Sequence, residues 1–342
     1  MDWRCLKGDG KRFFELLKDE VIFLFVIGNT KTAEIPGITV AGANPDLIRF
    51  TPPADVELLH YGECKVIPFP PATPDGKPTP AIITYTALRL TNVPFFAVDS
   101  GLMVKPNVPF VSIDAPVGEN IEVKPAMNLD DVEKAFKNAV ELGRQISKLA
   151  DVLMIGESIP AGTTTALAIL RALGIKTMVS SSMPKNPIEI KEQVVAKALK
   201  RIEGNEDPLE LIAKVGDPVM IGVCGIAIGS KKPVILAGGT QMVAMSHLIG
   251  RMKDDADIAI ATTVYVANDS NALGHAPCPV IVVDPGLADS TKPGLRAYAE
   301  GFVKEGVGAG GATLLAYVRG FSKEEFLKEI DRSYETVIES KL

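Results

Sequence analysis

The chain is poor in histidine and cysteine, the side chains that most often bind zinc or form disulfides. It has 3 histidines and 4 cysteines in 342 residues, and no two cysteines form a Cys-x-x-Cys pair. The histidines also lack the spacing that is typical of a metal site. We therefore expect core or surface roles for all of these side chains, with neither a metal centre nor a disulfide framework.

The chain also has no excess of positive charge. Lys and Arg number 36 against 42 Asp and Glu, which gives a net charge of −6. Proteins that bind a nucleic-acid backbone need clustered cations, so we expect no nucleic-acid partner. The early apolar run Val21–Ile27 is too short to span a membrane and lacks the basic leader and cleavage site of a signal peptide. We expect no membrane association and a cytoplasmic location.

The two common nucleotide-binding signatures are absent as well. The chain has no Gly-x-x-x-x-Gly-Lys-Ser/Thr motif, and no Gly-x-Gly-x-x-Gly follows its first expected strand. The sequence therefore gives little support to an ATPase or to a nicotinamide-dependent dehydrogenase.

What the chain does contain is a strand, a turn and a helix within residues 151–170. Val152–Ile155 is a short apolar run that predicts a buried parallel strand, and Thr163 opens a helix with apolar periodicity. The turn between them contains Gly156, Pro160 and Gly162. Free backbone N–H groups in the first turn of a helix attract anions, and glycines let a ligand approach the backbone. The stretch therefore predicts a phosphate site.

Two carboxylates lie beside such glycines. Glu157 is in the turn just described, where it is suited to a sugar hydroxyl or a base nitrogen; an ordinary N-cap acid is the alternative. Glu305 precedes the glycine-rich run 306–311, which opens an apolar helix. A carboxylate in an apolar setting has a raised pKa, as a general base requires. Close packing of helices at small residues would explain the same run.

Two further residues are weaker candidates. Asp99 ends the apolar run 93–98, and an acid at the carboxyl end of a strand can face a ligand or can simply cap the next turn. Lys191 follows Pro187 in an expected helix. Its ammonium reaches an anion if that helix begins near the crevice, and is otherwise solvated.

The alternation of apolar runs with helical segments predicts an α/β fold. We expect a three-layer, doubly wound, mainly parallel sheet of the Rossmann-like type, with a small helical lobe from the chain ends. Expected strands are 21–27, 93–98, 152–155, 177–180, 233–237, 258–261 and 280–283.

Residues 1–342 are interpreted as a single catalytic unit with three parts. Residues 80–300 form the α/β core, 1–20 and 300–342 the helical lobe, and 36–80 a Pro/Gly-rich arm that either binds a ligand or covers the body. The final helix, 323–342, carries apolar side chains that should dock on the body or on a partner subunit.

Six motifs in this order resemble the nicotinate-nucleotide:dimethylbenzimidazole phosphoribosyltransferase family, and specifically its archaeal branch. They are Val98-Asp-Ser-Gly101, Pro125-Ala-Met127, Gly156-Glu-Ser-Ile-Pro-Ala-Gly-Thr-Thr-Thr165, Lys191, Ser290-Thr-Lys-Pro-Gly294 and Glu305-Gly-Val-Gly-Ala309. One departure is Phe302, which stands where an arginine is common in the family.

The resemblance implies a reaction. The 5-phosphoribosyl group would move from nicotinate mononucleotide to 5,6-dimethylbenzimidazole or a related, purine-like base. The products would be nicotinate and α-ribazole 5′-phosphate, the precursor of a cobamide lower ligand. The resemblance implies no cofactor and no metal, and it implies a homodimer. Two alternatives stay open: a non-catalytic nucleotide-binding protein of the same fold, and a nicotinate nucleotide hydrolase.

The resemblance also implies residue roles. Glu305 would take the proton from the azole nitrogen of the incoming base, and Glu157 would assist near the same ring. The residues expected around the phosphate and ribose are Gly156, Gly162, Thr163, Thr164, Lys191, Ser290, Gly306 and Gly308. Val98 and Asp99 are expected beside the base.

Overall fold

A computed structural model describes residues 2–42 and 44–341. Its centre is an eight-stranded sheet in the order β1-β8-β7-β6-β5-β2-β3-β4, in which only β1 is antiparallel to its neighbour. The strands are β1 Trp3–Lys7, β2 Val21–Ile27, β3 Phe95–Asp99, β4 Phe110–Ser112, β5 Val152–Ser158, β6 Val234–Ala237, β7 Ile258–Thr263 and β8 Val280–Val283. The predicted mainly parallel α/β sheet is confirmed.

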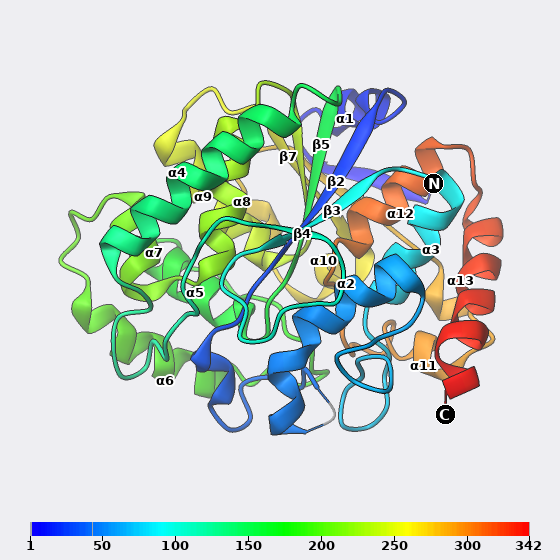
Figure 1. Ribbon diagram of the computed structural model, residues 1–342, viewed down its shortest axis with the longest axis horizontal. Coiled ribbons are helices and arrows are strands. Elements are labelled where there is room, and N and C mark those ends of the chain that lie inside the picture. The colour runs from blue at the N-terminus through cyan, green and yellow to red at the C-terminus, as the bar shows by residue number, and fades with distance from the viewer. Residues whose placement is uncertain (1, 43, 342) are drawn as a thin grey trace.

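Helices cover both faces of this sheet (Figure 1). Helices α4, α5, α8 and α9 lie on one side, and α3, α12 and α13 lie on the other. The helices are α1 Gly10–Leu16, α2 Thr51–Tyr61, α3 Ala81–Thr91, α4 Leu129–Ile146, α5 Gly162–Ala172, α6 Ile188–Ala198, α7 Pro208–Val215, α8 Pro218–Gly229, α9 Thr240–Met252, α10 Val264–Asp269, α11 Pro293–Arg296, α12 Ala309–Val318 and α13 Lys323–Val337.

Strand β2 shows why the core has two halves. All seven of its residues are buried. Leu24 and Val26 pack into the apolar cluster beneath α8 and α9, while Phe23 and Phe25 pack into the cluster on the opposite face. Side chains alternate along a strand, so a strand buried on both faces is apolar at every position. This is why the apolar run 21–27, in which polar and apolar residues do not alternate, predicted β2 correctly.

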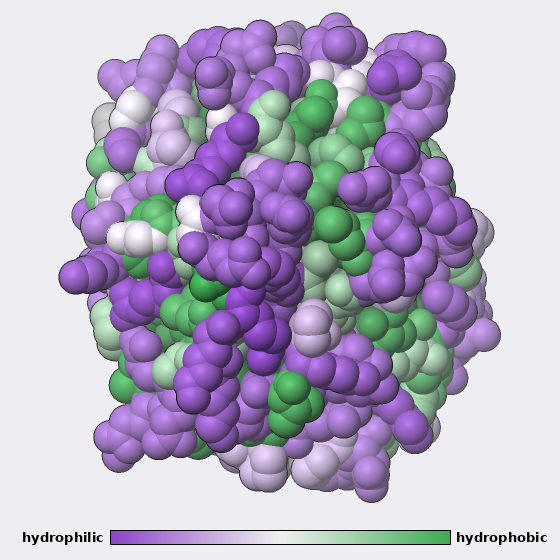
Figure 2. All heavy atoms as spheres, turned by 90° about the vertical axis from the view of Figure 1, so that its left-hand side faces the viewer, coloured by the Kyte–Doolittle hydropathy of each residue, from purple (hydrophilic) through white to green (hydrophobic). Residues whose placement is uncertain are grey.

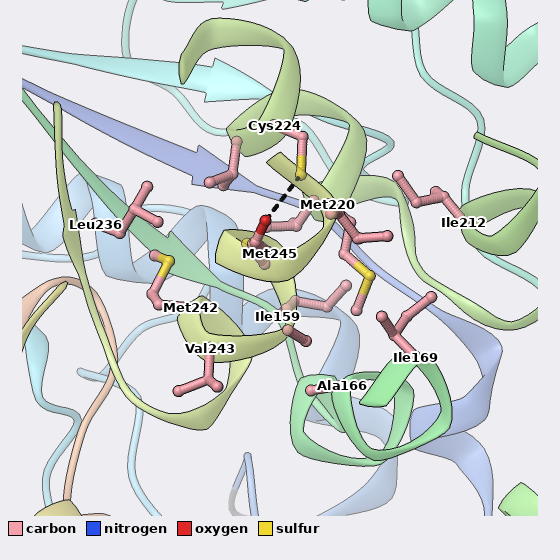
Figure 3. Close-up of a cluster of buried hydrophobic side chains, with 14 of the residues drawn as sticks. Ile159, Ala166, Ile169, Ile212, Met220, Cys224, Leu236, Met242, Val243 and Met245 are labelled. Carbon is pink, nitrogen blue, oxygen red and sulfur yellow. Dashed lines mark hydrogen bonds between the residues drawn. The ribbon is translucent and has the colours of Figure 1, made fainter. Parts of the chain in front are cut away.

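The first of these clusters is closed by α8 and α9. Met220 and Cys224 of α8 lie against Met242 and Met245 of α9 and Leu236 of β6 (Figure 3). The Cys224 thiol contacts the Met245 carbonyl oxygen at 3.8 Å and burial raises its pKa, so it has the core role expected for it.

Seen from the left of Figure 1, the outer face of the molecule is largely hydrophilic, with small apolar areas between (Figure 2).

Four segments differ from expectation. Residues 177–180 form no strand. Trp3–Lys7, placed in a helical lobe, is instead the edge strand β1, paired with β8. The arm contains an 11-residue helix, α2, whose first turn holds Pro52 and Pro53. Proline is tolerated there because the first N–H groups of a helix have no intrahelical acceptor. The fourth segment, Pro218–Gly229, has no element assigned to it from the sequence and forms the helix α8, whose apolar residues show no helical period because the helix is buried all round.

The strand order also locates a crevice. From β2 the chain adds β3 and β4 on one side of the sheet, and then β5 to β8 on the other, so the order reverses between β2 and β5. Ligands of open α/β sheets bind at the carboxyl ends of the strands at such a point.

Within the described ranges, every helix is too short or too polar to span a bilayer.

Candidate active site

A cavity opens at the carboxyl ends of β5 and β6, beside the point where the strand order reverses. It has about 980 Å³ of space, part of it open to solvent. Its walls come from the arm (Ile38–Gly42, Thr51, Asp55, Pro71–Thr73, Lys77–Pro80), from Glu157–Thr163, from Ser180–Ser182, from Gly239–Gln241 and Val266, and from Val303 with Glu305–Val307.

Glu157 and Glu305 both line this cavity, although 148 positions separate them in the chain. Glu157 is the penultimate residue of β5 rather than part of a turn, and its Oε1 accepts a hydrogen bond from Gln241 Nε2 at 3.2 Å. Burial raises the pKa of Glu157 to about 8, and the neighbouring Asp217 and Glu305 add to this. Its carboxyl group is therefore mostly protonated at neutral pH.

Glu305 is held by backbone donors. Its Oε2 accepts from Thr263 N at 2.9 Å, and its Oε1 from Gly310 N at 3.1 Å and Gly306 N at 3.2 Å. These bonds lower the pKa, but burial is the larger effect and raises the pKa of Glu305 to about 7. A carboxylate with this pKa both keeps a fixed geometry and exchanges a proton near neutral pH.

The loop that carries Glu305 has an unusual backbone. Val303, Lys304 and Val307 have φ values of 59°, 64° and 52°, a region that costs non-glycine residues about 1–2 kcal/mol each. The loop is fixed to its surroundings, since Val307 N donates to the Glu157 carbonyl oxygen at 2.9 Å. Strained backbone of this kind persists where the surrounding structure holds it, and it gathers at functional sites.

Gly156 and Gly308 do not line the cavity; they let this loop lie against β5. A Cβ on Gly156 would be 3.1 Å from Gly308 Cα, and a Cβ on Gly308 would be 2.6 Å from the ring of Phe23. Gly308 also has φ of 73°. Both glycines, predicted around the phosphate and ribose, thus have a packing role that sets the distance between the two carboxylates.

A second wall of the cavity has the features of an anion site. Gly162 and Thr163, in the first turn of α5, line it together with Ser180–Ser182. Behind these serines are two buried lysines. Lys191 Nζ donates to Ser180 O at 3.0 Å, and Lys304 Nζ donates to Ser181 O at 2.6 Å. The ammonium of Lys304 also pairs with Asp269 Oδ2 at 3.2 Å, which compensates part of the positive charge behind this wall.

The structure therefore corrects the expectation that the ammonium of Lys191 reaches a bound anion. Lys191 is fully buried and does not line the cavity, so its ammonium holds the serine segment rather than meeting a ligand. Burial lowers the pKa of Lys191 to about 7, and the nearby Lys304 lowers it further. Thr164 is also buried outside the cavity, and its Oγ1 has no hydrogen-bond partner among the described residues.

Three other predicted residues lie away from the cavity. Ser290 Oγ donates to Asp331 Oδ1 at 2.5 Å, so it holds α13. Val98 packs in the core. Asp99 accepts from Leu102 N at 3.0 Å and pairs with Lys105 at 2.6 Å, which is the capping role that the sequence left open. Strand β3 and the segment before α11 thus lie outside the walls of the cavity.

The sequence did not point to Asp55 or Gln241. Asp55 projects from α2 and accepts from Thr79 Oγ1 and Ser158 Oγ, both at 2.7 Å. Burial raises its pKa to about 7. The arm looked irregular because of its prolines, so no pattern marked an acid on its inner face.

In the described part of the chain, no group of three or more His, Cys, Asp or Glu is placed to hold a metal ion.

Comparison with known proteins identifies the family. A family model described as phosphoribosyltransferase matches residues 87–275, more than half of the chain. The chain belongs to this phosphoribosyltransferase family. It is also 60% identical to a UPF0284 protein of Archaeoglobus fulgidus, over 99% of this chain and 100% of that one. A UPF0284 protein of Saccharolobus solfataricus is 41% identical, over 97% of both chains. The resemblance to an archaeal branch of the family is thus confirmed.

Two solved structures share the fold of this phosphoribosyltransferase. Nicotinate-nucleotide-dimethylbenzimidazole phosphoribosyltransferase from Thermus thermophilus has a TM-score of 0.59 at 19% identity, covering 90% of this chain and 83% of its own. CobT from Thermus thermophilus has a TM-score of 0.61 at 18% identity, covering 95% and 92%. The family match contains Glu157, Gly162 and Thr163 but ends before Glu305.

Proposed function

We propose that this phosphoribosyltransferase moves the 5-phosphoribosyl group of nicotinate mononucleotide to 5,6-dimethylbenzimidazole or a related base. The products are nicotinate and α-ribazole 5′-phosphate. One observation carries the proposal: Glu157, Glu305 and the first turn of α5 line the same cavity. The fold shared with the Thermus thermophilus enzyme supports the same reaction class.

In this reaction the azole nitrogen of the acceptor base forms a bond to the anomeric carbon of ribose. The bond from that carbon to nicotinate breaks, and its electron pair leaves with nicotinate. Displacement at an anomeric carbon passes through an oxocarbenium-like state. Attack from the face opposite the leaving group converts the β-nucleotide into an α-nucleotide.

Glu305 is the proposed general base. It accepts the azole proton as the new bond forms, and its pKa of about 7 suits proton transfer near neutral pH. Its contacts with Thr263 N and Gly310 N fix the position of the carboxylate. Glu157, mostly protonated with a pKa of about 8, can donate a hydrogen bond to a ligand on the adjacent wall.

The proposed phosphate position is the wall formed by the first turn of α5 and Ser180–Ser182. Backbone N–H groups at a helix N-terminus favour a bound anion. The buried side chains of Lys191 and Lys304 hold the backbone of Ser180 and Ser181 in place without contacting the ligand. Asp55 and Glu305, each with a pKa of about 7, are partly ionised at neutral pH and disfavour an anion beside them, which leaves their part of the cavity to the base and the ribose.

A product assay tests the proposal. The protein is incubated with nicotinate mononucleotide and, in separate reactions, with benzimidazole, 5,6-dimethylbenzimidazole or a purine, and the products are identified by mass. We expect nicotinate release that depends on the base and a new α-nucleotide. Nicotinate release without any base would instead indicate a hydrolase, and no turnover with any base would indicate a nucleotide-binding protein.

We also propose that the protein is a homodimer, as the family resemblance implies. The apolar side chains of the final helix do not support a homodimer. Phe326, Ile330 and Val337 of α13 are buried within the chain itself. The exposed apolar side chains Phe96, Phe110 and Val111 gather instead at β3 and the edge strand β4. An unpaired edge with apolar side chains is a surface that a second subunit can cover.

A further inference from the structure

Among the described residues that line the cavity, Lys77 is the one basic side chain. The two buried lysines behind the serine segment donate to its carbonyl oxygens and do not reach the cavity. A phosphomonoester carries close to two negative charges at neutral pH. Lys77 is therefore the side chain that can bring an opposite charge into direct contact with a phosphate bound here.

The backbone of Lys77 is held by two hydrogen bonds, whereas its ammonium has one weak ion pair. Thr73 N donates to Lys77 O at 2.9 Å, and Lys77 N donates to Thr73 Oγ1 at 3.0 Å, which closes a tight loop. The ammonium pairs with Asp75 at 3.6 Å, beyond ordinary hydrogen-bond distance, and the Asp75 side chain is half exposed. Such a pair contributes little stability, so a ligand can replace Asp75 at small cost.

The position of this ammonium agrees with the proposed phosphate wall. Lys77 Nζ lies 5.2 Å from the centroid of the Phe302 ring. The next residue, Val303, lines the cavity, and its N–H donates to Ser182 O at 2.9 Å. The ammonium is thus beside the junction of the serine segment and the Glu305 loop.

We propose that Lys77 binds the 5′-phosphate of the phosphoribosyl donor, by exchanging Asp75 for a phosphate oxygen. The arm then supplies a binding residue to the donor site and is more than a cover. The name of the donor rests on the proposed function, whereas the contact itself requires only a phosphomonoester in the cavity.

Calorimetric titration tests this contact with three probes: nicotinate mononucleotide, nicotinate riboside and orthophosphate. Lys77→Met removes the charge and keeps the length of the side chain. A charge-assisted hydrogen bond to phosphate corresponds to about 10- to 100-fold in affinity. We expect a loss of that size for the mononucleotide, a weaker orthophosphate affinity, and a riboside affinity within about twofold of the original protein. Lys77→Arg should keep most of the mononucleotide affinity.

Lys65→Met is the matched control. Lys65 is also in the arm and also lies over an aromatic ring, with Nζ 3.6 Å from the centroid of Tyr61, but it is exposed and does not line the cavity. We expect this variant to bind all three probes as the original protein does. Thermal unfolding of each variant establishes that it is folded.

The inference is overturned if Lys77→Met binds the mononucleotide unchanged, if it loses riboside affinity equally, or if the unsubstituted protein binds neither phosphate-containing probe. Failure of the proposed function is a separate result. If no base accepts the phosphoribosyl group but orthophosphate binding still depends on Lys77, the donor reaction is wrong and the phosphate contact stands.

Discussion

Glu305 combines two opposing influences at one carboxyl group. Its hydrogen bonds from Thr263 N and Gly310 N favour the ionised form, and burial favours the protonated form more strongly. The pKa is raised to about 7, while the neighbouring Glu157 has a pKa of about 8. Burial raises both pKa values into the range in which a carboxyl group can accept a proton when ionised and donate a hydrogen bond when protonated.

Glu305→Gln keeps the size of the side chain and removes its ability to accept a proton. If Glu305 is the general base, kcat should fall by about 10²- to 10⁴-fold while binding of nicotinate mononucleotide changes little. Steady-state kinetics of base-dependent nicotinate release, with calorimetric titration of the mononucleotide, measure the two effects. Glu300→Gln, at an exposed glutamate five residues earlier, should leave both unchanged.

The same variant should change the pH profile. Below its pKa Glu305 holds a proton and cannot accept another, so kcat/KM of the original protein should fall as the pH drops below about 7. The residual activity of Glu305→Gln should lack this fall. A profile of the variant with the same acid limb would mean that another group is the base.

Some single residues could be identified from sequence and others could not. Glu157 and Glu305 stood beside glycines at expected strand or helix ends, and the structure brings them to one cavity. Lys191 stood in the right helix but faces the protein interior, and the facing of a helix is set by packing that the sequence alone does not specify. Asp55 carried no local signal at all, since only the folding of the arm over β5 brings it to Ser158.

At the scale of elements, the distance between the two carboxylates depends on how closely the 303–308 loop approaches β5. The contact is made through Gly156 and Gly308, whose backbones touch. The hydrogen bond from Val307 N to Glu157 O then joins the loop to the strand. A side chain at Gly156 would press on the backbone of Gly308, and one at Gly308 would press on the ring of Phe23 in β2.

Gly308→Ala tests this contact. The new Cβ would lie 2.6 Å from the Phe23 ring, and φ at this position is 73°. We expect a loss of about 2–4 kcal/mol in the free energy of unfolding, from overpacking together with the left-handed backbone. Denaturant unfolding measures it. Gly174→Ala is the matched control, with φ of 78° and no atom within 4 Å of the new Cβ, so it should lose only the backbone part. Equal losses in the two variants would contradict a role for close packing.

Elements were predictable where one local signal dominated. Strands β2, β7 and β8 followed from short apolar runs. The N-terminus of α4 has a local signal of the same strength in Asn128, whose side chain accepts from Asp130 N at 2.9 Å. Strand β1 has alternating exposure and exists because β8 offers it an edge, which is a tertiary cause. Residues 177–180 have strand-like composition but are held by contacts such as Asn271 Oδ1 to Met178 N instead of a neighbouring strand.

For the whole molecule, the order of strands explains why one cavity receives walls from segments throughout the chain. Parallel strands place their carboxyl ends at one edge, and the reversal between β2 and β5 leaves a gap there that the arm and the Glu305 loop enter. The sequence predicted this architecture because alternating strands and helices admit few other solutions. The surface of the proposed homodimer has no comparable local pattern.

The proposed homodimer therefore needs a measurement on the intact protein. Sedimentation at micromolar concentration should give twice the 36.4 kDa mass of the chain. If the edge at β4 is the covered surface, Val111→Lys should shift the equilibrium toward monomer, because a buried ammonium without a partner is costly. Leu149→Lys is the control, since Leu149 is 67% exposed but lies at the end of α4 and not at this edge. A monomer for the unsubstituted chain would contradict the dimer. A dimer that both variants leave intact would place the interface elsewhere.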